Sequence, residues 1–380
     1  MNTEPIAPEP AMPSAAGSPE WLRTLGRCAR YLGIRTVVIG LTVLAGIYAA
    51  IWVTNLGGFG DELRREEIRH DVTVSAIGVG LTTRVLPSIE QRQVMEELFE
   101  AAYKASDLDK PFVIRSFGYF RDALGLSLGS ARNMQTARGS HRVIDILAAG
   151  LPWTLLIFGV ANVLTFFAGL HMALILSRRY GSIVDRTTTL LVPVFAAPPW
   201  FHGLFLIVIF ALLTRLLPFG GILDSPIPQT SLGYVLSVLR HAILPIAALT
   251  LGTLPHAVYA NRALFLIHST EDFVELARAK GLASHRLRLR YILRPVLPAV
   301  ITNFALVSLV SWQAVIITEH VFNWPGLGEV LIDAIRSNEV AVIVGAVTMF
   351  AYLIGITVLF LDIVYVLVDP RVTLGSRRTG

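Results

Sequence analysis

VAVIVGAVTMFAYLIGITVLFLDIVYVLV, which runs from Val340 to Val368, is the stretch that decides the fold, and Asp362 is its one charged residue. A hydrocarbon core about 30 Å thick takes roughly 20 apolar residues of helix to cross. An unbroken apolar run of this length therefore predicts a helix that spans a lipid bilayer.

Working outward from it, five more apolar stretches are long enough to span. They run from about Ile34 to Leu56, Leu151 to Leu176, Thr189 to Leu213, His241 to Leu264 and Leu297 to Thr318. Ahead of the first stretch, the segment from Trp21 to Tyr31 carries arginines at helical spacing, which is typical of a helix lying on the membrane surface. We expect an all-α membrane protein with six transmembrane helices.

Composition narrows the class. Of 380 residues, 54% are hydrophobic and 16% are charged, whereas soluble domains are about 25% charged. These values exclude a disordered chain and an ordinary soluble enzyme. The single cysteine, Cys28, excludes an internal disulfide and a cysteine-based zinc cluster. The net charge of +5 does not indicate nucleic acid, because the basic residues stand beside apolar blocks, where they anchor a protein at the membrane surface.

Loop charge predicts the orientation, because short cytoplasmic loops carry an excess of Lys and Arg. The basic residues gather before the first stretch, after the second and fourth, and after the last: Arg23, Arg27, Arg30 and Arg35; Arg178, Arg179 and Arg186; Arg278, Lys280, Arg286, Arg288, Arg290 and Arg294; Arg371, Arg377 and Arg378. We therefore expect both termini in the cytoplasm of a multi-pass protein of the cell membrane.

The domain organisation follows from these stretches. Residues 1–20 lack the apolar core of a signal peptide and are expected to form a disordered cytoplasmic tail. Residues 21–56 hold the interfacial helix and first span, and residues 57–145 form an α-rich extracytoplasmic insertion, with helical periodicity over Gln91–Ala105. Residues 146–370 form a five-helix core, and residues 371–380 a second cytoplasmic tail.

The cytoplasmic loop at residues 268–298 has clear helix signals. Ser269 or Thr270 can cap a first helix, and Gly281 can end it. Ser284 can cap a second helix. The pattern predicts a helix, a turn and a second helix between two spans.

The end of this loop holds Pro295 and Pro298, which we expect to break the second helix before the fifth span. Small side chains beside Glu275 and Arg278 suit docking into a groove of a partner. The alternative is a pair of interfacial helices with solvated charges.

Three motifs carry a resemblance to a known family. Glu275-Leu276-Ala277, with Gly281 four residues further on, resembles the Glu-Ala-Ala…Gly loop of ABC-transporter permeases, although Leu276 replaces the middle alanine. The stretch EHVFNWPGLG at residues 319–328 and the ending DIVY…DPR at residues 362–371 resemble those of the dipeptide/oligopeptide branch. Residues 57–107 match nothing in that pattern.

The resemblance implies a permease that forms half of a translocation pathway for peptides or related small solutes. Its partners would be a second homologous permease, two ABC ATPase subunits, an extracytoplasmic solute-binding protein and the lipid bilayer. The chain has no Gly-x-x-x-x-Gly-Lys-Ser/Thr phosphate loop. We therefore expect no catalytic residue, metal or cofactor on this chain, with ATP and Mg²⁺ on the ATPases. Oligosaccharide or metal-chelate cargo remains an alternative.

The candidate site residues fall into three groups. The contacts that couple the permease to the ATPase would be Glu275, Ala277, Arg278, Lys280 and Gly281. Polar and aromatic groups inside spans are candidates for the pathway, with hydrogen bonding between helices as the alternative: Trp200, Asn303, Ser308, Ser311, Trp312 and Gln313. The outer gate loop would hold Glu319, Trp324, Pro325 and Gly326, with a turn that caps the fifth span as the alternative.

Two other classes compete with a permease. A multi-pass membrane enzyme needs a clustered site such as His-Glu-x-x-His, and Glu319-His320 has no second histidine at helical spacing. A proton-coupled transporter needs buried acidic residues and inverted repeats. Neither pattern is present in the sequence.

Overall fold

The computed structural model describes residues 20–55, 58–78, 89–194 and 197–368. In this part of the chain the secondary structure is helical, apart from one antiparallel bridge between Ser130 and Arg142. The first elements are α1 (Glu20–Thr54), α2 (Phe59–Gly78), α3 (Ile89–Ala105), α4 (Phe112–Leu124), α5 (Val143–Arg178), α6 (Ile183–Val194) and α7 (Pro199–Leu206). They are followed by the π-helical η2 (Ile207–Leu213), α8 (Ser231–Ser269), α9 (Asp272–Ala279), α10 (Ser284–Arg286), the π-helical η3 (Leu287–Leu293), α11 (Arg294–Val321), α12 (Leu327–Arg336) and α13 (Val340–Val368).

Five helices in the described residues are long and apolar enough to cross a membrane: Gly26–Thr54, Val143–Arg178, Ser231–Ser269, Ser284–Val321 and Val340–Val368. They correspond to the first, second, fourth, fifth and sixth expected spans. The expected interfacial helix and the first span are one continuous helix, α1, and Leu56 lies outside the described residues. The protein is therefore a multi-pass helical membrane protein.

The third expected span, over residues 189–213, is not one helix. α6 ends at Val194, and the apolar helix Pro199–Leu213 is shorter than a spanning helix. Pro198 lies between them in an extended conformation, with φ −57° and ψ 149°. Proline lacks a backbone N–H and holds the residue before it out of the helical region, so consecutive prolines end the helical path that hydropathy alone predicts.

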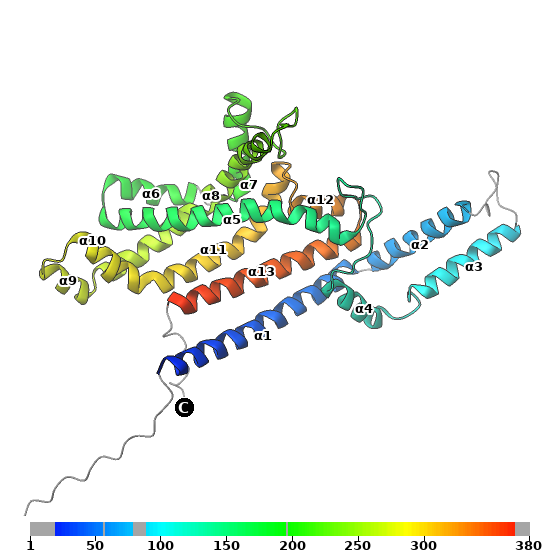
Figure 1. The fold of residues 1–380 in the computed structure, drawn as a ribbon, viewed down its shortest axis with the longest axis horizontal. Helices are drawn as coiled ribbons and strands as arrows, with labels where there is room; N and C mark the ends of the chain where they lie inside the picture. The colour runs from blue at the N-terminus through cyan, green and yellow to red at the C-terminus, as the bar shows by residue number, and fades with distance from the viewer. Residues whose placement is uncertain (1–19, 56–57, 79–88, 195–196, 369–380) are drawn as a thin grey trace, which may run out of the picture.

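α11 lies at the centre of the bundle. It packs against α5, α7, α8, α12 and α13, while α1 runs along α13; Figure 1 shows α5, α11, α13 and α1 side by side. The largest buried apolar cluster joins α5, α8, α11, α12 and α13. Within it, Phe158 stacks on Trp312 with ring centroids 3.8 Å apart.

The two ends of the bundle carry different elements. The start of α1, the end of α13, α9 and α10 lie at one end in Figure 1. Helices α2, α3, α4 and α12 lie toward the other end. We refer to these as the α9 end and the α12 end.

The insertion at the α12 end is helical, and α3 covers the stretch in which periodicity predicted a helix. Arg65 Nη2 donates to the hydroxyl of Tyr103 at 2.8 Å, which joins α2 to α3. The guanidinium of Arg115 donates to both carboxylate oxygens of Asp61, at 2.9 and 2.6 Å. This bidentate pair ties α4 to the start of α2.

Candidate functional site

α9 has one face turned inward. Val274 and Ala277 are buried and pack against Leu287, with Leu282, Tyr291 and Ile292 around them. Positions three apart lie on the same side of a helix, so Val274 and Ala277 form a narrow apolar stripe. This stripe attaches α9 to the start of the helix that becomes α11.

The opposite face of α9 is exposed and mixes apolar with charged side chains. Leu276 is 57% exposed and Phe273 is 43% exposed. Glu275, Arg278 and Lys280 are exposed on the same segment. A short helix with two exposed large apolar side chains among charges is suited to contact with another protein.

Ala277 lies on the buried face of α9, whereas its motif suggested that it contacts a partner. Its side chain is 3% exposed and is buried against Leu287, so a partner that approaches α9 does not reach it. Its apolar neighbour at helical spacing, Val274, was the sequence signal for this packing position.

Gly281 ends α9 as expected. Its φ of +75° lies in the left-handed region, which glycine adopts without the steric cost paid by other residues. Gly281 N donates to Arg278 O at 3.0 Å, and Leu282 N donates to Ala277 O at 3.3 Å. These bonds satisfy carbonyls that the end of a helix leaves free.

The start of α9 differs from the expectation. The cap residue is Glu271 rather than Ser269 or Thr270, because α8 continues to Ser269, and both hydroxyls donate to carbonyls of its last turn. The next helix has Ala283 at its cap, and Ser284 is its first residue.

Pro295 and Pro298 do not break the second helix. Residues 284–321 form one helix, and Pro295 stands at the start of α11 directly after the π-helical η3. A π-helical turn shifts the hydrogen bonding by one residue, which accommodates the N–H that proline lacks. The segment that holds α9 is thus continuous with the central helix of the bundle.

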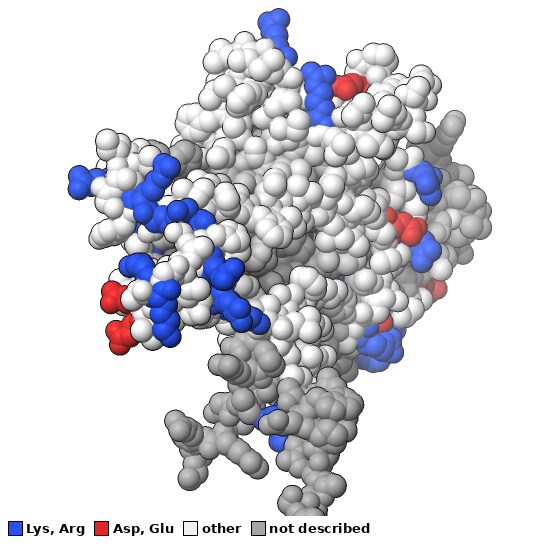
Figure 2. Space-filling view, turned by 60° about the vertical axis from the view of Figure 1, so that its left-hand side comes forward, with Lys and Arg blue, Asp and Glu red and all other residues white. Residues whose placement is uncertain are grey.

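Basic side chains cover the α9 end. Figure 2 shows Lys and Arg gathered on this face, with few acidic residues among them. The exposed basic residues of the loop are Arg278, Lys280, Arg286, Arg290 and Arg294.

Three expected pathway residues on α11 make hydrogen bonds to neighbouring helices. Asn303 Nδ2 donates to Asn261 Oδ1 on α8 at 3.2 Å. Ser308 Oγ donates to Asn162 Oδ1 on α5 at 3.0 Å, and Trp312 Nε1 donates to Thr357 Oγ1 on α13 at 3.2 Å. Each bond joins α11 to a different helix.

The other three expected pathway residues differ in how exposed their side chains are. Ser311 is buried and its hydroxyl donates to Val307 O at 2.8 Å. Trp200 is half-buried at the start of α7, and Gln313 is exposed on α11. Gln313 therefore has the side chain of this group that is most accessible from outside the chain.

The expected gate loop is a buried corner between α11 and α12. Glu319 and Trp324 are both 0% exposed. Glu319 Oε2 accepts a hydrogen bond from Gly328 N at 2.6 Å, at the N-terminus of α12, where negative charge is favourable. Trp324 Nε1 donates to Trp153 O at 3.0 Å. Pro325 and Gly326 complete the turn that leads into α12.

This corner also binds the start of α5. Leu327 N donates to Thr154 Oγ1 at 2.7 Å, and the backbone of Gly326 lies against Gly150 so closely that a Cβ on Gly150 would be 3.0 Å from Gly326 C. The corner is therefore packed between the end of α11, α12 and the start of α5.

One buried polar pair has no signal in the local sequence. Asp185 on α6 accepts from Arg262 on α8 through both oxygens, at 2.5 and 2.6 Å, and Gly181 N donates to the same carboxylate at 2.9 Å. The arginine holds the pKa of Asp185 below its ordinary value. The two residues are 77 positions apart, so no local pattern joins them, although Arg262 is a charge within an otherwise apolar stretch.

The fold and the site define a class: a multi-pass helical membrane protein with an exposed short helix fastened to its central helix. Comparison with known sequences gives the family. Residues 161–374 match the profile of the binding-protein-dependent transport system inner membrane components. The chain belongs to this family of transport permeases.

The two similar sequences described next are both named as peptide transport permeases. The chain is 31% identical over 300 residues to a di/tripeptide transport system permease protein of Pseudomonas aeruginosa, with 74% of this chain and 87% of the relative covered. It is 28% identical to an oligopeptide transport system permease protein of Bacillus subtilis, with 60% and 72% covered. Among solved structures, it is similar to a chain of the inward-facing MetNI methionine ABC transporter, with 18% identity, a TM-score of 0.49, and 60% of this chain and 99% of that chain covered.

Proposed function

We propose that this chain is the permease subunit of an ATP-driven ABC importer and forms half of a translocation pathway for peptides. The observation that carries the proposal is the attachment of α9 to the helix Ser284–Val321. A partner that binds the exposed face of α9 and moves it would also move the helix Ser284–Val321, which runs through the centre of the bundle. Coupling between sites needs such a connected set of packed elements.

The α9 end is then cytoplasmic, as are both termini, and α2–α4 face the outside. The support is the gathering of basic side chains at the α9 end (Figure 2), since Lys and Arg are enriched on the cytoplasmic side. Residues 189–194 at the end of α6 and residues 199–213 of α7 and η2 would together supply a sixth crossing, although neither helix spans alone.

The proposed partners are two ABC ATPase subunits, which bind ATP and Mg²⁺, a second homologous permease and an external solute-binding protein. The family description, which names binding-protein-dependent transport, supports this assembly. Glu275, Leu276, Arg278 and Lys280 would contact the ATPase, whereas Ala277 would hold α9 in place and Gly281 would set its end.

The pathway is proposed to include Gln313 and Trp200, because these side chains are accessible. Asn303, Ser308, Ser311 and Trp312 would set the positions of the helices around it. Because the corner at Glu319, Trp324, Pro325 and Gly326 is packed on α5, it would open the outer gate by moving together with α5 and α12.

The coupling role is tested by Glu275→Lys and Gly281→Pro in the assembled complex. Glu275→Lys reverses a charge on the exposed face of α9. Gly281→Pro places a residue limited to φ near −65° where φ is +75°. We expect both variants to insert and purify, with the ATPase lost on purification or its hydrolysis no longer stimulated by loaded binding protein.

The matched control is Glu97→Lys, the same charge reversal on the exposed surface of α3, which should leave ATPase retention unchanged. Normal transport by Glu275→Lys and Gly281→Pro would refute the coupling role.

The cargo is tested separately by mass spectrometry of the ligand that the copurified binding protein carries. The names of the relatives favour peptides. An oligosaccharide or a metal chelate in that position would identify one of the alternative cargoes and overturn the peptide assignment.

A further inference from the structure

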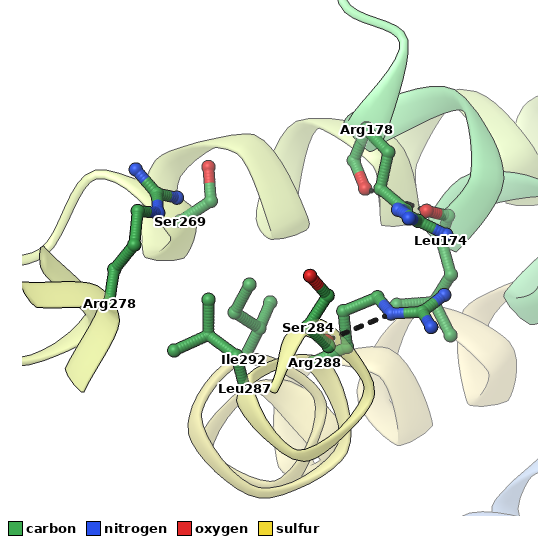
Figure 3. Close-up of a pocket in the computed structure, with 9 residues that line it drawn as sticks. Leu174, Arg178, Ser269, Arg278, Ser284, Leu287, Arg288 and Ile292 are labelled. Atoms are coloured by element: carbon green, nitrogen blue, oxygen red, sulfur yellow. Dashed lines mark hydrogen bonds between the residues drawn. The ribbon is translucent and has the colours of Figure 1, made fainter. Parts of the chain in front are cut away.

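A pocket of about 290 Å³ lies at the α9 end, between the end of α5, the end of α8, α9 and the start of the helix Ser284–Val321. Its lining consists of Leu174, Ser177, Arg178, Ser269, Arg278, Ser284, Leu287, Arg288 and Ile292. Figure 3 shows Arg278 on one side, Arg178 on the other and Ser284 between them. Arg278 is the one lining residue proposed above as a contact of the ATPase, and the pocket itself has no role described above.

Three arginines from three separate elements line it: Arg178 from α5, Arg278 from α9 and Arg288 from η3. No acidic residue is part of the lining, and among the described residues none of the three arginines forms an ion pair with a carboxylate. Like charges that share a concave site repel each other and concentrate a positive field in it. A bound anion would relieve that repulsion.

The helix that starts at Ser284 adds to this field. Its first backbone N–H groups have no partner within the helix, and its N-terminus carries partial positive charge. Arg288 Nε donates to Ser284 O at 3.2 Å, which holds the arginine beside this terminus (Figure 3). Guanidinium groups and helix N-termini together are suited to phosphate oxygens.

The rest of the lining is half polar and half apolar. It consists of the serines Ser177, Ser269 and Ser284 and of Leu174, Leu287 and Ile292, and the lining has no aromatic side chain on which a nucleotide base could stack. A volume of 290 Å³ lies at the lower end of ligand pockets, which start at about 300 Å³.

We propose that this pocket binds one phosphate group, from a phospholipid headgroup or from free phosphate, and that the bound phosphate braces α9 against α5. Arg178, Arg278 and Arg288 donate to its oxygens, so the ligand joins three elements that otherwise repel one another. The inference concerns binding by this chain and does not depend on the cargo.

The test uses the full-length chain in a maltoside detergent, which contains no phosphate, and measures its thermal unfolding midpoint. One arm adds inorganic phosphate, with sodium chloride at matched ionic strength as the reference. The second arm adds phosphatidylglycerol to the same detergent and no inorganic phosphate. We expect a saturable rise of the midpoint in at least one arm.

The two arms separate the sources. A rise with phosphatidylglycerol alone identifies a lipid headgroup, and a rise with inorganic phosphate alone identifies the free anion. No rise in either arm overturns the proposal.

The variants are Arg178→Gln and Arg288→Gln, each expected to weaken the response at least tenfold. Arg179→Gln is the matched control, because Arg179 is adjacent, exposed and absent from the pocket. Arg288→Lys keeps the charge and should recover part of the response, which separates anion binding from a loss of folding. A response that is equally strong in Arg178→Gln, Arg288→Gln and Arg179→Gln would contradict the assignment.

Discussion

The two ends of the helix Ser284–Val321 are held by different kinds of contact. At the α9 end, three buried apolar residues attach a short helix whose other face is exposed and charged. At the α12 end, Glu319, Trp324 and Leu327 are fully buried and hydrogen-bonded to α5 or α12.

The difference separates two roles. Exposed apolar side chains among charges are characteristic of a surface that another protein covers, whereas a buried corner with hydrogen bonds between its elements stabilises the chain itself. Changes at the α12 end should therefore reduce stability, and changes on the exposed face of α9 should reduce assembly without reducing stability.

The largest expected effect comes from Trp324→Ala. The side chain is fully buried, its indole packs edge-on against Trp153, and its Nε1 donates to Trp153 O. Removing a buried tryptophan costs about 3–5 kcal/mol of the free energy of unfolding. The thermal unfolding midpoint in detergent measures the loss, with Phe219→Ala, 60% exposed, as control. Equal midpoints for the two variants would contradict the role of the corner.

Asp185→Asn should have the next largest effect, because buried polar contacts also stabilise the α9 half of the bundle. The variant leaves Arg262 without its carboxylate, and breaking a buried pair costs about 3 kcal/mol or more. The same melting assay applies, with Asp71→Asn on exposed α2 as control.

The pH dependence of this pair has a definite sign. Arg262 lowers the pKa of Asp185 from its ordinary value of 3.8, so the stabilisation is complete above about pH 4 and is lost as the pH falls through the lowered pKa. The difference in midpoint between wild type and Asp185→Asn should be constant from pH 5 to 7 and shrink in stronger acid. A difference that grows on acidification would exclude this account.

Gly328→Ala should have a smaller effect at the same corner. A Cβ at this position would lie 2.6 Å from Ile316 Cα and 2.7 Å from Glu319 Oε2, so α12 must shift away from α11. Such overpacking costs about 1–3 kcal/mol. Gly159→Ala is the matched control, because a Cβ there meets nothing within 4 Å, and it should leave the melting midpoint unchanged or raise it.

The smallest effect on stability is expected for Leu276→Ser. Substitution at a side chain that is 57% exposed changes the free energy of unfolding by about 0.5 kcal/mol or less. We expect ATPase retention to fall all the same, whereas Leu98→Ser, on exposed α3, should leave it intact. A drop in melting midpoint as large as that of Gly328→Ala would place Leu276 in the chain's own packing.

The sequence predicts features that depend on neighbouring residues. Apolar runs identify five of the long helices, and Gly281 marks the end of α9 because a left-handed residue at a helix end is a local requirement. The prediction of a single third span was wrong because hydropathy counts apolar residues and does not register that Pro198 interrupts the helix. The prediction of a break at Pro295 was wrong in the opposite direction, because the helix continues from the π-helical turn that precedes this proline.

In the candidate site, too, local features were predictable from the sequence and contacts between distant residues were not. The motif placed Ala277 among the contacts of a partner, although its spacing from Val274 indicates the buried face. The pair of Asp185 and Arg262 and the bond from Trp324 to Trp153 join residues far apart in the chain. Such pairs depend on how the helices pack, and one sequence does not show that packing.

The continuity of residues 284–321 has a mechanical consequence. A helix of 38 residues is about 57 Å long at 1.5 Å per residue. If it tilts as a rigid rod about one end, each degree displaces the far end by about 1 Å. Under the coupling proposed above, a tilt of one degree about the Gly281 end would move the far end, near Glu319, by about 1 Å without any rearrangement of side chains along the helix.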